Sequence, residues 1–355
     1  MGTAQRRVSA VAGWVAAAAV IGGGTPGAWQ APDGDPFAFL APWVRFSPAE
    51  RERLDGGEVI AKPLPTSDRQ AAVVVVARVR AVPDRLVVWT QAIDRFRRGR
   101  FVLAIGRFSD PPVPSDLDAL TLDTEDVAAI TQCRPGGCAL KLTAAEMSAF
   151  APLRSLPAAE RHAAVHAAFR RLVLERLRVY RAGGLGALDA PADGEPRRIA
   201  DAFSALVDRS PYLGRVPALV QWLRTWPPGP ALDDAFFYWS KESYGSGKPV
   251  VSVTHVGIHR PPPGADRPAV VVAGKQLLAT HYTNASLGLT MLLGGEGGRP
   301  AYLVYLNRTE LDILGGFFGG LARSTMERRL GRQAPLVVQD LRRRLESGLP
   351  DPAVP

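Results

Sequence analysis

Cysteine, histidine and long apolar runs are scarce in this sequence, and their scarcity restricts what the protein can be. Only two cysteines and five histidines occur, so few residues of the kinds that bind zinc are present. The Gly-x-Ser-x-Gly signature of serine hydrolases is absent, and the run from Gly245 to Pro249 lacks the full spacing of a phosphate loop. No segment after the N-terminus is long and apolar enough to cross a bilayer. The sequence therefore identifies no reaction by motif.

The overall composition is that of a folded protein. Hydrophobic residues make up 46% and charged residues 22% of the 355 positions, which excludes wholesale disorder and allows a substantial core. The formal net charge of +9 is spread widely, with its densest short run at Arg342-Arg343-Arg344. A diffuse positive charge favours anionic surfaces. No basic helix with interleaved aromatic residues occurs, so we expect no nucleic-acid partner.

The N-terminus has the order of a secretory signal peptide. Arg6-Arg7 precedes the apolar run Val8–Ile21, and small residues follow from Gly22 to Ala28. We expect residues 1–30 to be removed on export, which places the protein in the periplasm or outside the cell. A retained N-terminal anchor is the alternative, although the run is shorter than the roughly 20 residues a spanning helix needs. Contact with a membrane is compatible with this interpretation, but no spanning helix is expected after signal removal.

The two cysteines flank a strong turn sequence. Pro135-Gly136-Gly137 lies between Cys133 and Cys138, so the two side chains can face each other across a tight hairpin. In an exported protein this spacing predicts a disulfide. A free, reactive pair is the alternative, and a zinc pair would need further ligands that do not lie close in sequence.

The C-terminal part of the chain predicts an α+β fold. β-branched and aromatic runs divided by glycine and proline indicate an antiparallel meander, and the closing segment Leu314–Glu346 has apolar residues at a helical spacing. We expect a curved antiparallel sheet that grips this C-terminal helix. The predicted strands of this part begin at Phe236 and continue at Val250–Arg260, at Ala269–Leu293 as one long strand, and at Ala301–Thr309.

In the preceding part of the chain, changes in the pattern of apolar residues mark the boundaries of the predicted elements. A strand at Gln70–Ala81 and a helix at Pro83–Phe96 open the domain, and residues 157–230 read as a helical insertion. We expect an irregular arm at 31–57, one domain at 58–347 and a disordered tail at 348–355. A further strand is expected at Cys138–Leu142.

The order of elements resembles the helix-grip fold of START-like lipid-transfer and polyketide-cyclase proteins. The points of likeness are the run Ala81–Trp89 leading to Asp94, Tyr238-Trp239-Ser240 at a strand start, and Tyr302–Arg308 before the final helix. This resemblance implies a cavity between sheet and helix that binds a lipid-like or other apolar ligand, with or without catalysis.

The leading functional hypothesis is an exported protein that binds a hydrophobic ligand in that cavity, without a cofactor. Glycines around Phe317 would let the start of the helix move as a gate, or would only form a sharp corner that seats the helix. A cell-envelope interaction module without a ligand, docking on a protein partner, is one alternative. The candidate ligand-binding residues are Tyr238, Trp239, His255, His281, Tyr282, Tyr305, Phe317 and Met326.

A metal-dependent hydrolase is the other alternative. His255 and His259 share one face of a predicted strand, and His281 lies on the predicted neighbouring strand, so the three could hold zinc. Core histidines with satisfied hydrogen bonds are the favoured interpretation, because no carboxylate stands at a fixed spacing to orient them. His162 and His166 are four apart on a helix but lack the glutamate of the zincin motif.

The segment from Asp110 to Asp126 is rich in aspartate. Carboxylates are the ligands that calcium prefers, but their spacing here does not match the EF-hand. We therefore expect solvated turns and helix caps, with Asp116 and Thr124 as N-caps.

Overall fold

The computed structural model describes residues 34–67, 69–194, 196–227, 232–244, 247–264, 266–295, 299–315 and 319–350. Within helix α9, side chains are described from Arg323 onward. The predicted signal peptide at 1–30 lies outside the described residues.

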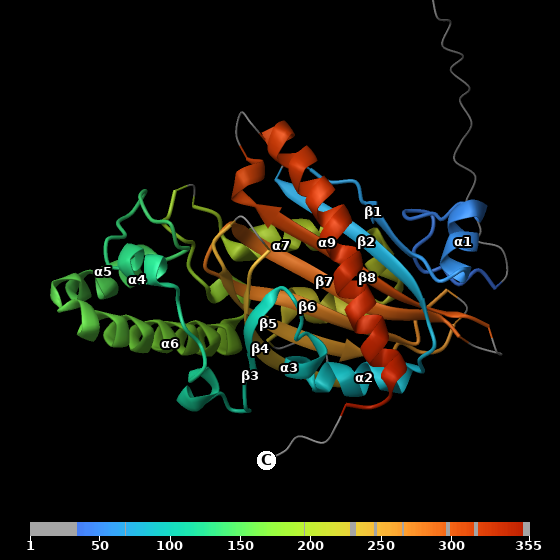
Figure 1. Cartoon of the computed structure of the whole chain (residues 1–355), viewed down its shortest axis with the longest axis horizontal. Helices are drawn as coiled ribbons and strands as arrows, with labels where there is room; N and C mark the ends of the chain where they lie inside the picture. The colour runs from blue at the N-terminus through green and yellow to red at the C-terminus, as the bar shows by residue number, and fades with distance from the viewer. Residues whose placement is uncertain are drawn as a thin grey trace, which may run out of the picture. The chain divides into compact units, whose positions relative to one another are not determined.

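Within the described residues, eight antiparallel strands form one open sheet in the order β1-β2-β8-β7-β6-β5-β4-β3 (Figure 1). β2 and β8 lie far apart in sequence but pair along the whole of β2, from Gln70↔Glu310 to Val79↔Ala301. This confirms the predicted α+β class. The strands are β1 (Val59–Pro63), β2 (Gln70–Val79), β3 (Val102–Arg107), β4 (Asp234–Glu242), β5 (Val250–His259), β6 (Val270–Ala279), β7 (Thr283–Gly294) and β8 (Ala301–Leu311).

Helix α9 (Gly319–Ser347) packs across one face of the sheet, which we call the front face (Figure 1). Its buried residues Ala334, Val338, Leu341 and Leu345 meet the front side of β2 and its neighbours. Each buried leucine or valine contributes about 1.5–3 kcal/mol. The predicted C-terminal helix on the sheet is confirmed, although it begins after a short 3₁₀ turn, η6 (Asp312–Leu314).

Two further helices share the front layer with α9. α2 (Pro83–Gln91) and α3 (Ile93–Phe96) place Leu86, Trp89 and Phe96 in the same core cluster as the C-terminal half of α9. Arg85 donates to the carbonyl of Leu345 at 2.9 Å, and the Trp89 indole donates to the carbonyl of Gly348 at 2.8 Å. α2, α3 and the end of α9 therefore form one continuous surface.

The opposite, back face is covered by the described residues of the long connection between β3 and β4, and by the N-terminal segment, whose Phe37 and Leu40 belong to one core cluster with Val74 of β2. The helix α6 packs its apolar side toward Trp239 and Val253, while α7 lies against β7 (Figure 1). The helices off the front face are α1 (Pro48–Asp55), α4 (Thr124–Ile130), α5 (Ala144–Phe150), α6 (Ala158–Gly183), α7 (Ile199–Asp208) and α8 (Pro217–Thr225), with 3₁₀ turns η1 (Pro114–Leu117), η2 (Ala151–Ser155), η3 (Leu185–Ala187) and η4 (Pro211–Arg215).

The prediction of one long strand at Ala269–Leu293 is wrong. The chain turns at Thr280-His281-Tyr282, so the segment makes two paired strands, β6 and β7. No glycine or proline marks this turn, and Tyr282 adopts a positive φ of 62°. Contacts of His281 with residues far away in the sequence stabilise the turn, and a local sequence pattern cannot predict such contacts. The strand expected at Cys138–Leu142 is also not formed.

The predicted disulfide between Cys133 and Cys138 is confirmed. Among the described residues, no helix is both long and apolar enough to span a membrane.

Candidate ligand site between the sheet and the C-terminal helix

The candidate ligand-binding residues divide between the two faces of the sheet. Tyr238 and Tyr305 point to the front face, where they belong to the core cluster under α9. Trp239 and His255 point to the back face and pack with the α6 side. Neighbouring residues on a strand point in opposite directions, so Tyr238 and Trp239 cannot line one cavity.

The remaining candidates lie away from this front cluster. His281 and Tyr282 lie in the turn between β6 and β7. Met326 is half-buried near Leu311 and Leu314, beside the N-terminal half of α9. Phe317 lies outside the described residues.

Tyr238 and Tyr305 surround an arginine that the sequence did not single out. The side chain of Arg97, which follows α3, is only 26% exposed and donates to Glu242 at 3.3 Å. Its guanidinium carbon lies 6.0 Å from the ring centre of Tyr238. Glu242 also accepts a hydrogen bond from the hydroxyl of Tyr244. One carboxylate is thus shared by a cation and a phenol.

The charges of this cluster are well defined. The Tyr238 oxygen, once it ionises at high pH, and after it the carboxylate of Glu242 hold the pKa of Arg97 well above its usual value despite the opposing effect of burial. Burial raises the pKa of Tyr238 and of Tyr305. Both phenols therefore stay protonated at neutral pH and remain able to donate hydrogen bonds beside a permanent cation.

One donor of Arg97 is unused. Its Nε is buried and has no hydrogen-bond partner in the described part of the chain. A buried polar group left unsatisfied costs about 1–3 kcal/mol, more when it is charged. Such a group marks a place where an acceptor from a ligand would be stabilised.

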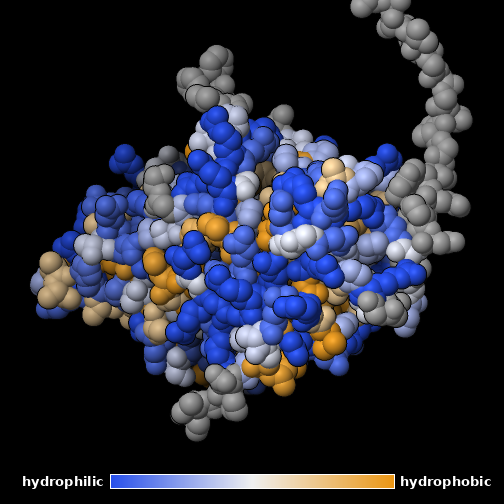
Figure 2. Space-filling view, turned by 45° about the vertical axis from the view of Figure 1, so that its right-hand side comes forward, coloured by the Kyte–Doolittle hydropathy of each residue, from blue (hydrophilic) through white to orange (hydrophobic). Residues whose placement is uncertain are grey.

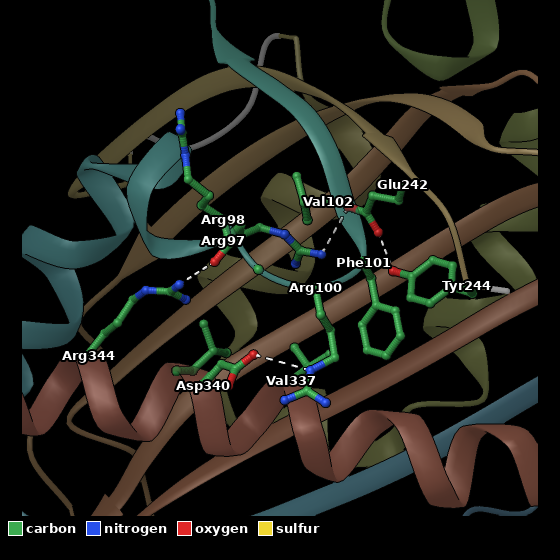
Figure 3. A pocket seen from close by; sticks show the side chains of 12 residues that line it. Arg97, Arg98, Arg100, Phe101, Val102, Glu242, Tyr244, Val337, Asp340 and Arg344 are labelled. Atoms are coloured by element: carbon green, nitrogen blue, oxygen red, sulfur yellow. Dashed lines mark hydrogen bonds and ion pairs between the residues drawn. The ribbon is translucent and has the colours of Figure 1, made fainter. Parts of the chain in front are cut away.

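The arginine borders a small cavity between α9 and the start of β3 (Figure 3). Its volume is about 30 Å³, room for about two water molecules. Arg100 approaches Asp340 of α9 at 4.0 Å, and Arg344 donates to the carbonyl of Phe96 at 2.8 Å. The lining residues are Arg97, Arg98, Gly99, Arg100, Phe101, Val102, Glu242, Tyr244, Val337, Asp340, Leu341 and Arg344.

The lining combines excess positive charge with apolar side chains. Four arginines face two carboxylates, Glu242 and Asp340. Val337 and Leu341 of α9 supply an apolar wall, opposite Phe101. An anionic group next to an aliphatic chain fits this combination, because arginine donates in a planar fork that matches carboxylate and phosphate oxygens.

A polar strip continues along the front face from this cluster. The residues share small size and partial exposure, although they lie in the middle of the sheet. The amide of Asn307 donates to Ser286 at 3.2 Å, and Ser286 lies 2.9 Å from Thr309. The strip consists of Ser252, Thr254, Gly274, Ser286, Gly288, Thr290, Asn307 and Thr309.

Two glycines leave the middle of this strip without side chains. Gly274 pairs with Gly288, and Gly288 pairs with Asn307. A Cβ on Gly288 would meet only the Asn307 amide, at 4.0 Å. The sheet surface there is accessible to an incoming molecule, a feature that glycine in a strand often signals and that single-sequence patterns hide.

The three histidines of the metal hypothesis each have a different partner. His255 shares a hydrogen bond with Tyr180 at 2.9 Å, His259 lies 3.7 Å from Asp233, and His281 contacts Asp126 at 2.8 Å. Among the described residues, no group of three or more histidine, cysteine, aspartate or glutamate side chains could hold a metal ion. Burial, helped by Lys275 and Arg181, lowers the pKa of His255 well below its usual value, so its ring is neutral at pH 7.

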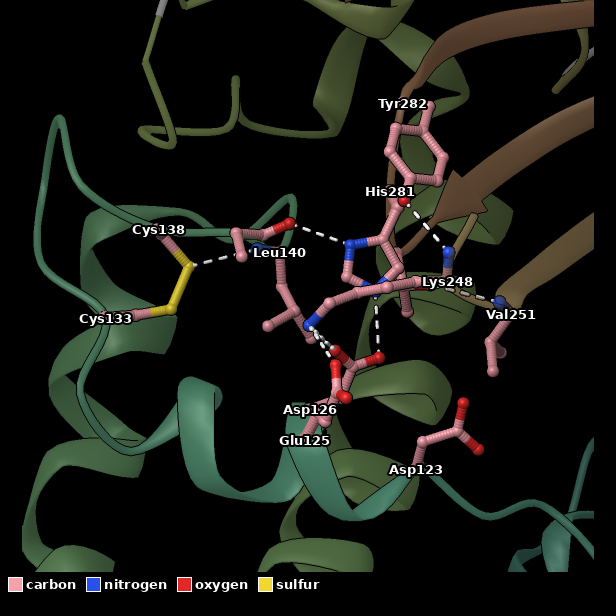
Figure 4. A network of polar contacts seen from close by, with 12 residues as sticks. Asp123, Glu125, Asp126, Cys133, Cys138, Leu140, Lys248, Val251, His281 and Tyr282 are labelled. Atoms are coloured by element: carbon pink, nitrogen blue, oxygen red, sulfur yellow. Dashed lines mark hydrogen bonds and ion pairs between the residues drawn. A yellow bond between two sulfur atoms is a disulfide. The ribbon is translucent and has the colours of Figure 1, made fainter. Parts of the chain in front are cut away.

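His281 instead anchors a polar network at one end of the sheet (Figure 4). Its two ring nitrogens lie 2.8 Å from acceptors, the carbonyl of Ala139 and the carboxylate of Asp126. Neither partner carries a proton to donate, so both contacts are hydrogen bonds only when both nitrogens are protonated. Lys248 donates to the other oxygen of Asp126 at 2.9 Å. The network ties α4 and the disulfide loop to the sheet.

Asp126 is ionised in this network. Burial alone would raise its pKa, but hydrogen bonds from His281 and Lys248 outweigh that effect and lower it. The sequence suggested only caps and turns for the aspartate-rich segment, because the lysine and histidine that bind Asp126 lie more than a hundred residues away.

A second buried cation lies on the back face. Lys275 of β6 is 1% exposed, and its ammonium group donates to the carbonyls of Trp222 and Leu223 at 3.3 and 3.1 Å. The same group lies 4.7 Å from the centre of the Trp222 ring. Burial lowers the pKa of Lys275 to about 7. The lysine caps the C-terminal end of α8, where a positive charge is favourable.

Comparison of the chain with protein-family models and with curated proteins finds no match. The functional conclusion therefore depends on the geometry alone.

Proposed function

We propose that the protein binds a lipid-like amphipathic molecule with an anionic group, in the cleft between the front face of the sheet and α9. The observation that carries this proposal is the buried, unpartnered Nε of Arg97 at the edge of a cavity lined by four arginines. The anionic group would accept from Arg97, and the phenols of Tyr238 and Tyr305 lie beside it. This mode of binding resembles that of helix-grip proteins, and the α+β architecture is compatible with membership of that superfamily.

The apolar part of the ligand would lie between α9 and the polar strip. Val337 and Leu341 supply aliphatic contacts, and Gly288 leaves room on the sheet, because a Cβ there would meet only the Asn307 amide, at 4.0 Å. Ligand pockets are mostly apolar with a few polar groups that fix orientation. In the proposed site the charged groups lie at one end, the aliphatic contacts come from α9, and the hydroxyl and amide groups of the polar strip line the sheet side.

A ligand of lipid size requires α9 to move. Drug-sized ligands occupy roughly 300–1,000 Å³, far more than the cavity in this structure. Pro335 inside α9 removes the backbone donor that would bond the carbonyl of Gly331. We expect the segment before Gly331 to swing, because the apolar contacts of its described side chains come from Met326 and Leu330, which are only half-buried, whereas the segment after Pro335 is buried at Val338 and Leu345.

Binding of oleate and of oleyl alcohol tests the proposal. Both have the same chain, but only oleate carries an anionic group. Hydrogen bonds to charged groups contribute about 1.5–3 kcal/mol, so Arg97→Gln should weaken oleate binding roughly 10- to 100-fold. Arg178→Gln, an exposed arginine of α6 paired with Glu175, is the matched control and should leave the affinity unchanged.

Equilibrium dialysis with each purified variant provides the affinities, and circular dichroism confirms that each variant is folded. Equal affinity for oleate and oleyl alcohol, or an Arg97→Gln variant that binds like the control, would contradict the role of the arginine. A chain that binds neither molecule, and that carries none by native mass spectrometry, would favour the alternative of an envelope interaction module.

A further inference from the structure

The net positive charge of the chain belongs to two segments. Residues 78–100 and 319–347 contain fourteen arginines and five acidic residues, a net charge of +9. This equals the formal net charge of the whole chain, so the rest of the sequence is balanced. Every basic residue in these segments is an arginine. The charge that appears spread along the sequence is therefore confined to two stretches.

The fold brings these two stretches together on one side. Residues 78–100 span the end of β2, α2, α3 and the following loop, while 319–347 is α9, and both helical parts cover the front face (Figure 1). Arg80 donates its backbone N–H to Glu346 at 3.0 Å, and Arg344 donates to the carbonyl of Phe96 at 2.8 Å. We call this surface, α2, α3, the loop to Arg100 and α9, the arginine face.

Exposed aliphatic side chains lie on the arginine face. Val82 and Val88 of the α2 region are 59% and 36% exposed, and Leu349 just after α9 is 66% exposed. Trp89 holds Gly348 by a hydrogen bond, so Leu349 lies beside α2. On the side of the molecule that Figure 2 shows, hydrophobic patches lie among hydrophilic side chains. Arg98, Arg100 and Arg343 are exposed on the same face.

We propose that the arginine face docks on the surface of an anionic phospholipid bilayer. Arginine forks complement lipid phosphates, and the aliphatic side chains at α2 and Leu349 can enter the boundary between headgroups and acyl chains. Each basic residue near an anionic surface strengthens binding about fivefold. Single-stranded nucleic acid would instead require aromatic rings on which bases stack, whereas the exposed side chains named here are aliphatic.

This docking surface is a separate inference from ligand binding. The two are connected in space, because Arg98, Arg100 and Arg344 line the small cavity and also belong to the arginine face. A protein docked in this way would have its proposed ligand site next to the bilayer, from which an amphipathic molecule could be taken up.

Vesicle sedimentation tests the inference. The vesicles are phosphatidylcholine alone or phosphatidylcholine with about a third phosphatidylglycerol, at low and high salt. We expect binding only to the anionic vesicles, and loss of binding at high salt because charges near the surface are screened. The variant Arg328→Gln, Arg332→Gln, Arg343→Gln should bind at least tenfold more weakly, and none of these residues lines the cavity.

The matched control is Arg154→Gln, Arg171→Gln, Arg178→Gln, three exposed arginines of η2 and α6 away from the arginine face. Its vesicle binding should equal that of the unmodified chain. Equal binding to both vesicle types, equal weakening by both triple variants, or no binding to either vesicle would overturn the inference. So would arginine-dependent binding of an oligonucleotide without vesicle binding. Oleate binding that persists without vesicle binding would leave the proposed function standing.

Discussion

Replacing Lys275 with methionine should stabilise the protein, and the gain should depend on pH. The ammonium group of Lys275 is buried with no carboxylate among its described contacts, only the carbonyls of Trp222 and Leu223 and three aromatic rings. Burial lowers the lysine pKa from 10.5 to about 7. Methionine fills similar volume and needs no hydrogen bond, so Lys275→Met removes the cost of burying a charge.

The sign of the pH dependence follows from the two pKa values. Between pH 7 and 10.5 the unfolded lysine holds a proton that the folded one has released, so the free energy of unfolding of the unmodified chain rises with pH. The full slope is about 1.4 kcal/mol per pH unit, and the slope is about half of that at pH 7, where the folded lysine is half protonated. The advantage of Lys275→Met should therefore be about 2.3 kcal/mol larger at pH 7 than at pH 9.

Urea unfolding at pH 7, 8 and 9 measures this difference. All other titratable groups are the same in the two proteins, so their contributions cancel when the proteins are compared at each pH. Lys275→Arg is the control that keeps the charge, and it should destabilise at every pH because the larger guanidinium does not fit the site. A constant difference between Lys275→Met and the unmodified chain from pH 7 to pH 9 would refute the reasoning, since the folded lysine would then hold its proton throughout.

Two further predictions concern stability. Asp126→Asn should lower the free energy of unfolding by about 2–4 kcal/mol at pH 7, because it leaves His281 without its anionic partner and Lys248 with only the more distant Glu125, at 3.7 Å. The carboxylate stabilises above its unfolded pKa near 3.8 and loses this effect as pH falls through its lower folded value, so the gap in urea unfolding should narrow as the pH falls below 3.8. Leu341→Ala in α9 should lower the free energy of unfolding by about 2–4 kcal/mol, measured by calorimetry, because Leu341 is buried. The control Leu349→Ala, at an exposed position, should change it by less than about 0.5 kcal/mol. Equal effects of the two substitutions would show that α9 does not pack as described.

Local patterns predicted most of the sheet and the helix that covers it. The run of valines in β2 is buried on both sides, and such a run is typical of a strand covered by two layers. The apolar residues of α9 form one buried stripe, so the helix can be predicted from their spacing without knowing which part of the sheet it packs against. The turn at His281 was missed because tertiary contacts with Ala139 and Asp126, not turn residues, hold it.

The candidate site was only partly predictable. Tyr238 and Tyr305 were proposed from the sequence, and the structure brings them together around Arg97. Trp239 and His255 were proposed with them, but strand alternation turns these two to the back face. Arg97 carries no local signal, because its burial depends on the pairing of β3 with β4 and on the approach of α9.

The sequence alone determined the types and approximate bounds of the main elements and the disulfide, because hydrophobic spacing and turn chemistry act over a few residues. Tertiary structure decided which residues share a face, a cavity or a surface. It gathered two arginine-rich stretches, more than two hundred residues apart, onto one side of the sheet. Coulombic interaction and burial depend on distance in space, and only the paired strands and packed helices set that distance.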